Sequence, residues 1–190
     1  MKNITEKQAE YIKKFVLATE KLPGDLAEVG VSIGDSAEVI CQNKGERALH
    51  LFDTFTGHPK GWIGRYDYGQ TPGRHAADLA TVKQRLSKYP NTRYYPGIFP
   101  ETSPPVKNKL FSFVHLDTDL YESTKWGLEF FFPRLVQDGI IVVHDSTYIL
   151  GVGVAIVDYF AERHKQQTQD WQAVTELELN QTFIKKCLTQ

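Results

Sequence analysis

Short apolar runs alternate with segments of helical periodicity along most of this 190-residue chain, and this alternation constrains the fold more than any other feature. The apolar runs predict strands at residues 26–31, 48–52, 92–95, 110–116 and 139–143. Helical spacing predicts an opening helix within residues 1–22 and further helices at 35–42, 76–89, 122–136 and 152–164. Strands that alternate with helices need crossover connections, so we expect a mainly parallel sheet with helices on both faces.

The last part of the chain departs from this alternation. Residues 171–179 and 181–188 look like two strands on either side of a tight turn at Asn180. We expect this pair to give the sheet one antiparallel edge. The length of the chain fits one domain, so residues 1–190 are interpreted as a single α/β domain.

The composition excludes several classes of protein. The chain has 22 Lys and Arg against 23 Asp and Glu, which gives no basic excess for a nucleic acid or an anionic membrane. The apolar fraction of 41% is enough for a compact core, so disorder of the whole chain is excluded. No apolar run is long enough to cross a bilayer, and the N-terminus lacks the apolar core of a signal peptide. With only two cysteines, Cys41 and Cys187, we expect a reduced, cytoplasmic protein.

Acidic residues follow three of the predicted strands. Asp53 ends the second strand, Asp117 and Asp119 follow the fourth, and His144-Asp145 follows the fifth. Carboxylates held together raise one another's cost of ionisation, so they need cations or hydroxyl donors nearby. Ligands of open parallel sheets bind beyond the carboxyl ends of the strands. We therefore predict a site at this rim of the sheet.

A glycine-containing turn joins the first strand to the next helix. Gly30 and Gly34 let the backbone approach a ligand closely, and the following helix presents unpaired N–H groups. The dinucleotide fingerprint would need glycine at positions 28, 30 and 33, where this chain has Glu28, Gly30 and Ile33. A carboxylate at position 28 disfavours a pyrophosphate and suits a ligand with a cationic group. A purely structural glycine turn is the alternative.

Asp53 follows the glycine turn at the spacing typical of nucleotide sites. A carboxylate at the end of the second strand can accept hydrogen bonds from both ribose hydroxyls of an adenosine. The alternative is a surface aspartate that caps the next turn. We favour the ribose role because the glycine turn precedes it.

Five motifs occur in order between about residues 25 and 148. They are Glu28-x-Gly30-x-x-x-Gly34-x-Ser36, Asp53-Thr-Phe55-x-Gly57, Gly97-x-Phe99-x-x-Thr102, the block 117–125, and His144-Asp145. With these motifs the chain resembles the macrocin O-methyltransferase family, which belongs to the class I S-adenosylmethionine-dependent methyltransferases.

The resemblance implies a Rossmann-like three-layer sandwich with a seven-stranded, mostly parallel sheet whose last strand is antiparallel. It implies that S-adenosylmethionine lies over the glycine turn. The cofactor-binding residues would be Glu28, Gly30, Gly34, Ser36 and Asp53. It also implies a divalent metal, usually magnesium, at the ends of the fourth and fifth strands. The metal ligands would be Asp117, His144 and Asp145.

One position departs from the family pattern, because relatives commonly have two adjacent acids where this chain has His144-Asp145. Magnesium prefers oxygen ligands, so His144 weakens the metal site, shifts it toward a softer ion, or lies outside the metal shell. A bound metal would lower the pKa of an acceptor hydroxyl and orient it. Without a metal, Asp117 or His144 is the candidate catalytic base.

We therefore expect an O-methyltransferase that acts on a hydroxyl of a small-molecule acceptor, such as a sugar or a glycosylated natural product. One alternative is an S-adenosylmethionine-binding protein without catalysis, which the His144 departure keeps open. The other is a nicotinamide-dependent oxidoreductase, which Glu28 and the misplaced third glycine disfavour.

Two segments bear on the acceptor. The glycine-rich stretch 56–75 is predicted to be a flexible loop near the active site, whose aromatic residues either close over the acceptor or are ordinary loop residues. Only one helix precedes the first strand, where relatives commonly have a long extension. This favours either an open site for a large acceptor or a site completed by a neighbouring subunit of a homo-oligomer.

Overall fold

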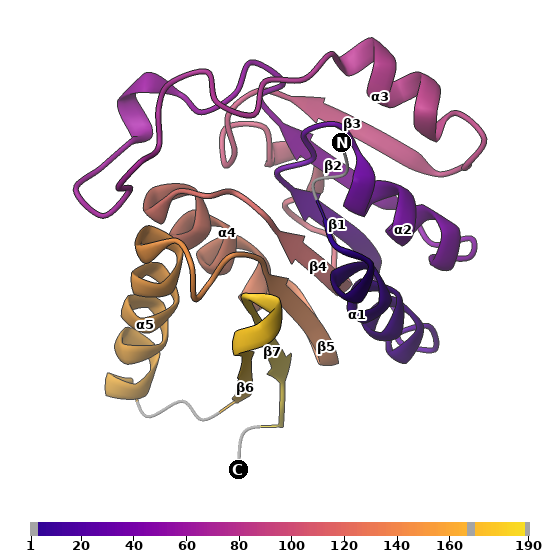
Figure 1. Cartoon of the computed structure of the whole chain (residues 1–190). Helices are drawn as coiled ribbons and strands as arrows, with labels where there is room; N and C mark the ends of the chain where they lie inside the picture. The colour runs from indigo at the N-terminus through magenta and orange to yellow at the C-terminus, as the bar shows by residue number, and fades with distance from the viewer. Residues whose placement is uncertain (1–3, 167–169, 189–190) are drawn as a thin grey trace.

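The computed structural model describes residues 4–166 and 170–188, which form one seven-stranded sheet with helices on both sides (Figure 1). The strands are β1 (Asp25–Val29), β2 (Leu49–Asp53), β3 (Thr92–Pro96), β4 (Phe111–Leu116), β5 (Leu135–Val143), β6 (Trp171–Glu176) and β7 (Gln181–Lys186). The helices are α1 (Glu6–Ala18), α2 (Asp35–Asn43), α3 (Leu79–Leu86), α4 (Tyr121–Arg134) and α5 (Leu150–Lys165). Three short 3₁₀ turns are η1 (Lys60–Trp62), η2 (Pro104–Val106) and η3 (Leu177–Leu179).

The sheet order is β3-β2-β1-β4-β5-β7-β6, with β7 antiparallel to both of its neighbours. This confirms the predicted Rossmann-like sheet with an antiparallel last strand, and it confirms the antiparallel strand pair at one edge. Within that pair β7, the last strand in the chain, lies one place inside the edge. The reason is the connection through α5. After α5 the chain passes the position next to β5 and forms β6 at the edge of the sheet. It then reverses, and β7 pairs with both β5 and β6.

Two apolar cores lie on opposite faces of the sheet. On one face, Ile12 of α1 and Ile40 of α2 pack with strand residues such as Leu49. On the other face, Phe131 of α4 and Val152 of α5 pack with the opposite sides of the same strands. Figure 1 shows α1 and α2 on one side of the sheet and α4 and α5 on the other. The three-layer arrangement follows from burying both faces of a mainly parallel sheet.

The predicted boundary between the helix 122–136 and the strand 139–143 is wrong. The helix ends at Arg134, directly after Pro133, and β5 begins at Leu135, whose side chain is buried against β4. Asp138 adopts a left-handed conformation with φ 64°, so an irregularity interrupts the strand and hides it from a simple apolar pattern.

The C-terminal hairpin is shorter than predicted. The strand expected over 171–179 ends at Glu176, and residues 177–179 form η3. Asn180 has φ 55°, which confirms the tight turn. Among the described residues, no helix has the length and apolar character needed to cross a bilayer.

Candidate active site

A cavity of about 610 Å³ opens at the carboxyl ends of β1, β2, β4 and β5. The sequence-predicted residues that line it are Gly30, Asp53, Asp117, His144 and Asp145. The structure thus brings together, from four strands, residues that are far apart in the chain. The other three predicted residues, Glu28, Gly34 and Ser36, lie outside the set of described residues that line the cavity.

Gly30 is where the first strand turns under the cavity. Its φ is 87°, and a Cβ atom there would lie 1.8 Å from the main-chain oxygen of Asp117. Asp117 N–H in turn donates to the carbonyl of Val29 at 2.9 Å. Glycine is therefore required because the segment after β4 passes directly against the turn after β1.

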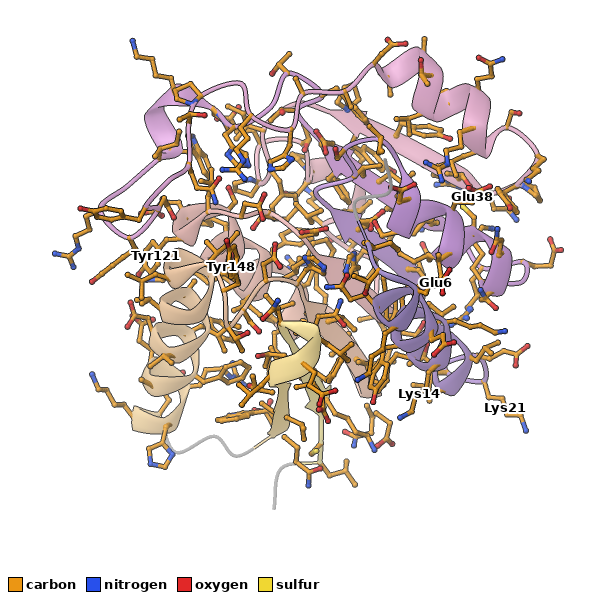
Figure 2. The ribbon with its side chains drawn as sticks, in the orientation of Figure 1. Glu6, Lys14, Lys21, Glu38, Tyr121 and Tyr148 are labelled. Carbon is orange, nitrogen blue, oxygen red and sulfur yellow. The ribbon has the colours of Figure 1, made fainter. Side chains whose placement is uncertain are left out.

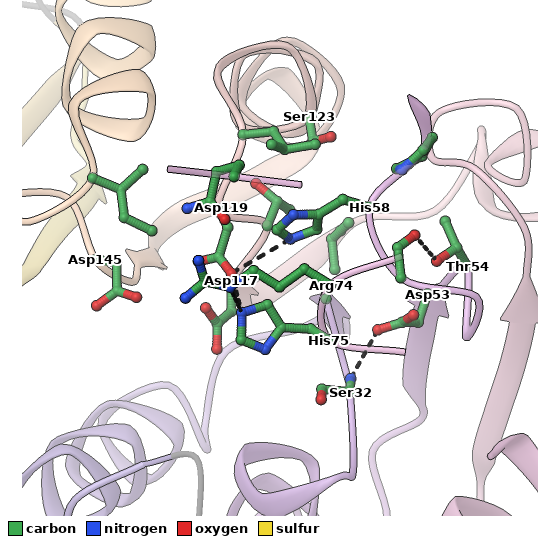
Figure 3. Close-up of a pocket in the computed structure, with 18 of the residues that line it drawn as sticks. Ser32, Asp53, Thr54, His58, Arg74, His75, Asp117, Asp119, Ser123 and Asp145 are labelled. Atoms are coloured by element: carbon green, nitrogen blue, oxygen red, sulfur yellow. Dashed lines mark hydrogen bonds and ion pairs between the residues drawn. The ribbon is translucent and has the colours of Figure 1, made fainter. Parts of the chain in front are cut away.

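Asp53 organises this turn. Its Oδ2 accepts hydrogen bonds from the N–H groups of Val31 at 2.6 Å and Ser32 at 2.8 Å, and its Oδ1 accepts from Phe55 N–H at 2.6 Å. Figure 3 shows the contact with Ser32 at the floor of the cavity. A carboxylate offers about four acceptor positions, so one remains for a ligand hydroxyl. The structure therefore gives Asp53 a capping role and also places it in the cavity wall.

Glu28 lies behind the turn rather than in the cavity. Its Oε1 is 2.8 Å from Nδ1 of His115 on the neighbouring strand β4, and both side chains are fully buried. Burial raises the pKa of the Glu28 carboxyl, although His115 opposes that change. Gly34, with φ 85°, and Ser36 form the beginning of α2. Glu28, Gly34 and Ser36 therefore support the glycine turn without lining the cavity.

Asp117, His144 and Asp145 form what we call the central group. Nδ1 of His144 lies 3.2 Å from Asp117 Oδ1 and 3.3 Å from Asp145 Oδ1. Burial disfavours the charged forms, but the attraction between imidazolium and carboxylates outweighs it. The pKa of His144 is raised to about 11, and the pKa of Asp117 is lowered to about 2. His144 therefore carries a proton at neutral pH when only these residues surround it.

His58, His75 and Asp119 form a second cluster, which we call the loop group. Asp119 Oδ2 lies 3.5 Å from Nε2 of His58 and 3.4 Å from Nε2 of His75 (Figure 3). This group was not predicted from the sequence, because the two histidines are 17 residues apart and lack a motif. The one available signal was their position at the two ends of the loop 56–75.

The loop closes on itself at its base. His58 N–H donates to the carbonyl of Arg74 at 3.0 Å, and Gly73 N–H donates to the carbonyl of His58 at 3.0 Å. This pairing of the two ends brings His58 and His75 together, with ring centroids 5.4 Å apart. The loop lies beside the cavity, and His58, Tyr68 and Arg74 line it.

A buried carboxylate anchors the tip of the same loop. Asp67 accepts hydrogen bonds from Gly64 N–H at 2.7 Å and from Tyr121 N–H at 2.8 Å. Tyr121 is the first residue of α4, and the preceding Leu120 has a hydrocarbon side chain that cannot cap the helix. Asp67, which belongs to the loop rather than to the helix, therefore caps the N-terminus of α4. Tyr121 itself packs away from the cavity, and its hydroxyl donates to Asp158 at 2.9 Å (Figure 2 labels Tyr121).

The chain is similar to several known proteins. The pattern of the family described as Macrocin-O-methyltransferase (TylF) matches residues 5–179. The chain is 30% identical over 151 residues to 8-demethyl-8-(2,3-dimethoxy-alpha-L-rhamnosyl)-tetracenomycin-C 4'-O-methyltransferase of Streptomyces olivaceus, covering 72% of this chain and 58% of that protein. It is 28% identical over 160 residues to mycinamicin III 3''-O-methyltransferase of Micromonospora griseorubida, covering 75% and 62% respectively.

The fold is also found among solved structures. The O-methyltransferase NovP superposes with a TM-score of 0.77 over 96% of this chain and 80% of that one, at 22% identity. The chain spans about three-fifths of the length of the two curated relatives above. Because the family pattern covers nearly the whole sequence, the chain belongs to the macrocin O-methyltransferase (TylF) family.

Proposed function

We propose that this protein is an S-adenosylmethionine-dependent O-methyltransferase whose acceptor is a hydroxyl of a glycosylated small molecule. The observation that carries the proposal is that the Gly30 turn, Asp53 and the central group line the same cavity. The names of the two relatives describe methylation of a rhamnosyl-tetracenomycin and of mycinamicin III, which supports a small glycosylated acceptor here.

The residues at the turn fit the methyl donor. Asp53 retains an acceptor position for a ribose hydroxyl, and the Gly30 turn brings main chain to the cavity floor. S-adenosylmethionine supplies an electrophilic methyl group on a positively charged sulfur. The cavity carries four carboxylates that favour such a cation, from Asp53, Asp117, Asp119 and Asp145. Glu28, Gly34 and Ser36 would act on the donor by holding the turn and the start of α2 in place.

The central group fits a divalent metal. Its two carboxylate oxygens and one imidazole nitrogen all lie within 4.8 Å of one another, and His144 Nδ1 is buried without a partner of hydrogen-bond geometry among the described residues. We propose that Asp117, His144 and Asp145 hold this ion, with manganese favoured over magnesium because one ligand is nitrogen. The ion would lower the pKa of the acceptor hydroxyl. To ligate, His144 must release the proton that the two carboxylates otherwise keep on it.

The acceptor hydroxyl must also lose a proton. His144 is a poor base in either state: as a metal ligand its nitrogen is occupied, and without the ion its raised pKa keeps a proton on the ring at neutral pH. Asp117 is a weak base for the related reason that its pKa is lowered to about 2. We propose that Asp119 accepts the proton, because it faces the same cavity two residues beyond Asp117.

The proposal is tested by titrating the purified protein with S-adenosylhomocysteine, with and without Mn²⁺, and by measuring methyl transfer to a panel of rhamnosides and other glycosides. We expect binding of the nucleoside and a mass increase of one methyl group on at least one glycoside. NADH serves as the negative control for the oxidoreductase alternative. Nucleoside binding with no transfer to any acceptor would favour the binding protein without catalysis, and no nucleoside binding would contradict both.

A further inference from the structure

The loop group has the composition of a metal site of its own. Two imidazole nitrogens and one carboxylate oxygen lie within 4.8 Å of one another. The nitrogen-to-oxygen distances of 3.4 and 3.5 Å are longer than an ordinary N–H···O hydrogen bond. The three atoms therefore converge on a common point without bonding well to one another.

These separations match the geometry of a bound ion. A tetrahedral ion with ligands at about 2.1 Å holds neighbouring ligand atoms about 3.4 Å apart. Both distances from Asp119 Oδ2 already have this value to within 0.1 Å. The backbone also adopts unusual conformations to present the ligands, since Asp119 has φ 60° and His75 has φ 63°. Non-glycine residues seldom occupy that region, and it is common at ligand sites.

Burial differs across the loop group in a way that suits an exchangeable ion. The side chains of His58 and Asp119 are 9% and 14% exposed, whereas that of His75 is 42% exposed. Three protein ligands with an open side toward a cavity leave a position for water or a ligand hydroxyl, as in catalytic metal sites. His75 is also free to make the small movement that would complete the geometry.

Arg74 competes with an ion for His75. Its Nε–H donates to Nε2 of His75 at 2.9 Å, and an arginine can only donate, so this nitrogen presents its lone pair. The lone pair is the form that a metal needs. Arg74 is exposed, and its other bond, to the carbonyl of Gly69, is also at the surface. Its side chain can therefore move into solvent when an ion takes its place.

We propose that His58, His75 and Asp119 bind a divalent transition-metal ion, separately from the central group. Two nitrogen ligands select borderline ions such as Zn²⁺ and Co²⁺ over Mg²⁺. An ion here ties both ends of the loop 56–75 to the segment after β4. It also occupies the carboxylate that we assign to proton acceptance, so Zn²⁺ inhibits methyl transfer while the ion of the central group supports it. The binding step itself does not depend on the proposed function.

The experiment titrates metal-free protein with Zn²⁺ against a chromophoric chelator and records the visible absorption of the Co²⁺ form. We expect two sites in the unaltered protein. His58→Gln and His75→Gln each weaken one site by about 100-fold, and Asp145→Asn weakens the other. Arg74→Gln strengthens the site that the two histidine variants weaken. His164→Gln, at an exposed position in the last turn of α5, is the matched control and keeps both sites.

Two results would overturn the inference. One is Zn²⁺ binding by His58→Gln and His75→Gln with the affinity and stoichiometry of the unaltered protein. The other is an unaltered protein that binds no ion beyond the one lost in Asp145→Asn. Circular dichroism checks that each variant is folded. If His58→Gln does not fold, His75→Gln still tests the site, because His75 is exposed. Binding of S-adenosylhomocysteine, measured in parallel, separates failure of this site from failure of the proposed function.

Discussion

The central group and the loop group contain the same two kinds of side chain in opposite proportions. In the central group one imidazole faces two carboxylates, and their combined charge keeps a proton on His144 with a pKa of about 11. In the loop group two imidazoles face the single carboxylate of Asp119, and Arg74 donates to His75. The first group must lose a proton to bind a cation, whereas the second presents a nitrogen lone pair already. The ratio of carboxylates to imidazoles, rather than the residue types alone, decides whether a group keeps a proton or presents a nitrogen lone pair to a cation.

The largest expected effect comes from the turn that supports both groups. Gly30→Ala places a methyl group within 1.8 Å of the Asp117 carbonyl oxygen, so β4 and the segment that carries both Asp117 and Asp119 must move. We expect a loss of about 3 kcal/mol or more in the free energy of unfolding, with loss of S-adenosylhomocysteine binding. Denaturant unfolding measures the free energy of unfolding, and titration calorimetry measures the binding of S-adenosylhomocysteine.

Gly45→Ala is the matched control for that substitution. Gly45 also has a positive φ, of 59°, but a Cβ atom there would meet nothing within 4 Å. We expect a loss of about 1 kcal/mol from backbone strain alone. Equal losses in the two variants would show that the contact with Asp117 is unimportant.

The next effect separates the donor site from the central group. Asp117→Ala leaves the His144 charge with only Asp145 as its partner, so methyl transfer should fall by about 10³-fold or more while S-adenosylhomocysteine still binds. Asp53→Ala should weaken nucleoside binding by at least about tenfold, because the glycine turn loses its two hydrogen bonds to this carboxylate, from Val31 and Ser32. Titration calorimetry measures nucleoside binding by the two variants, and single-turnover rates measure their methyl transfer. A similar loss of nucleoside affinity in both variants contradicts separate roles.

The proton on His144 predicts a pH dependence for the central group. Its pKa of about 11 lies above the working range, so a metal must displace one proton at any pH in that range. The apparent Mn²⁺ affinity should therefore rise about tenfold for each unit between about pH 6 and 8. The measurement is best made in His58→Gln, in which the proposed loop-group site is about 100-fold weaker. An affinity independent of pH would mean that His144 does not ligate the ion.

The smallest effect tests the loop anchor. Asp67→Ala removes the hydrogen bonds to Gly64 and Tyr121, and we expect a loss of about 1–2 kcal/mol in stability. Zn²⁺ affinity of the loop group should fall several-fold, while the Mn²⁺ affinity of the central group stays unchanged. Asp78→Ala is the control, because Asp78 caps α3 through Ala80 and Thr81 at a distance from the loop tip. Loss of Zn²⁺ affinity in that control as well would mean that general destabilisation is responsible.

Much of the fold follows from local sequence. The strand 110–116 and the acids after it were predictable, because a continuous apolar run bounded by polar residues is typical of a buried parallel strand. Leu135 was wrongly predicted as helical, because the helix ends one residue after Pro133 and the strand then contains an irregularity. Neither feature changes the hydrophobic pattern enough to be recognised.

The candidate site was only partly predictable for a related reason. Residues at strand ends meet because parallel strands end at one rim, and this rule brought Asp53, Asp117 and Asp145 together. Loop closure has no comparable periodic signal, so the meeting of His58 and His75 was not predicted. The direction of Glu28 depends on its partner His115 on a neighbouring strand, which a pattern within one strand does not reveal.

The double attachment of the loop has a consequence for how this enzyme family can diversify. The loop is fastened at its base by the His58 and Arg74 pairing and at its tip by Asp67, which leaves two short spans between fixed points. The span after the tip carries Tyr68, which lines the cavity and is 90% exposed. The carbonyls of Gly69 and Thr71 accept hydrogen bonds from Arg74, so the main chain of this span is fixed, while the exposed side chain of Tyr68 can be exchanged without disturbing the sheet. Under the proposed function, directed evolution at Tyr68 would change the cavity wall available to the acceptor and leave Gly30 and Asp53 unaltered.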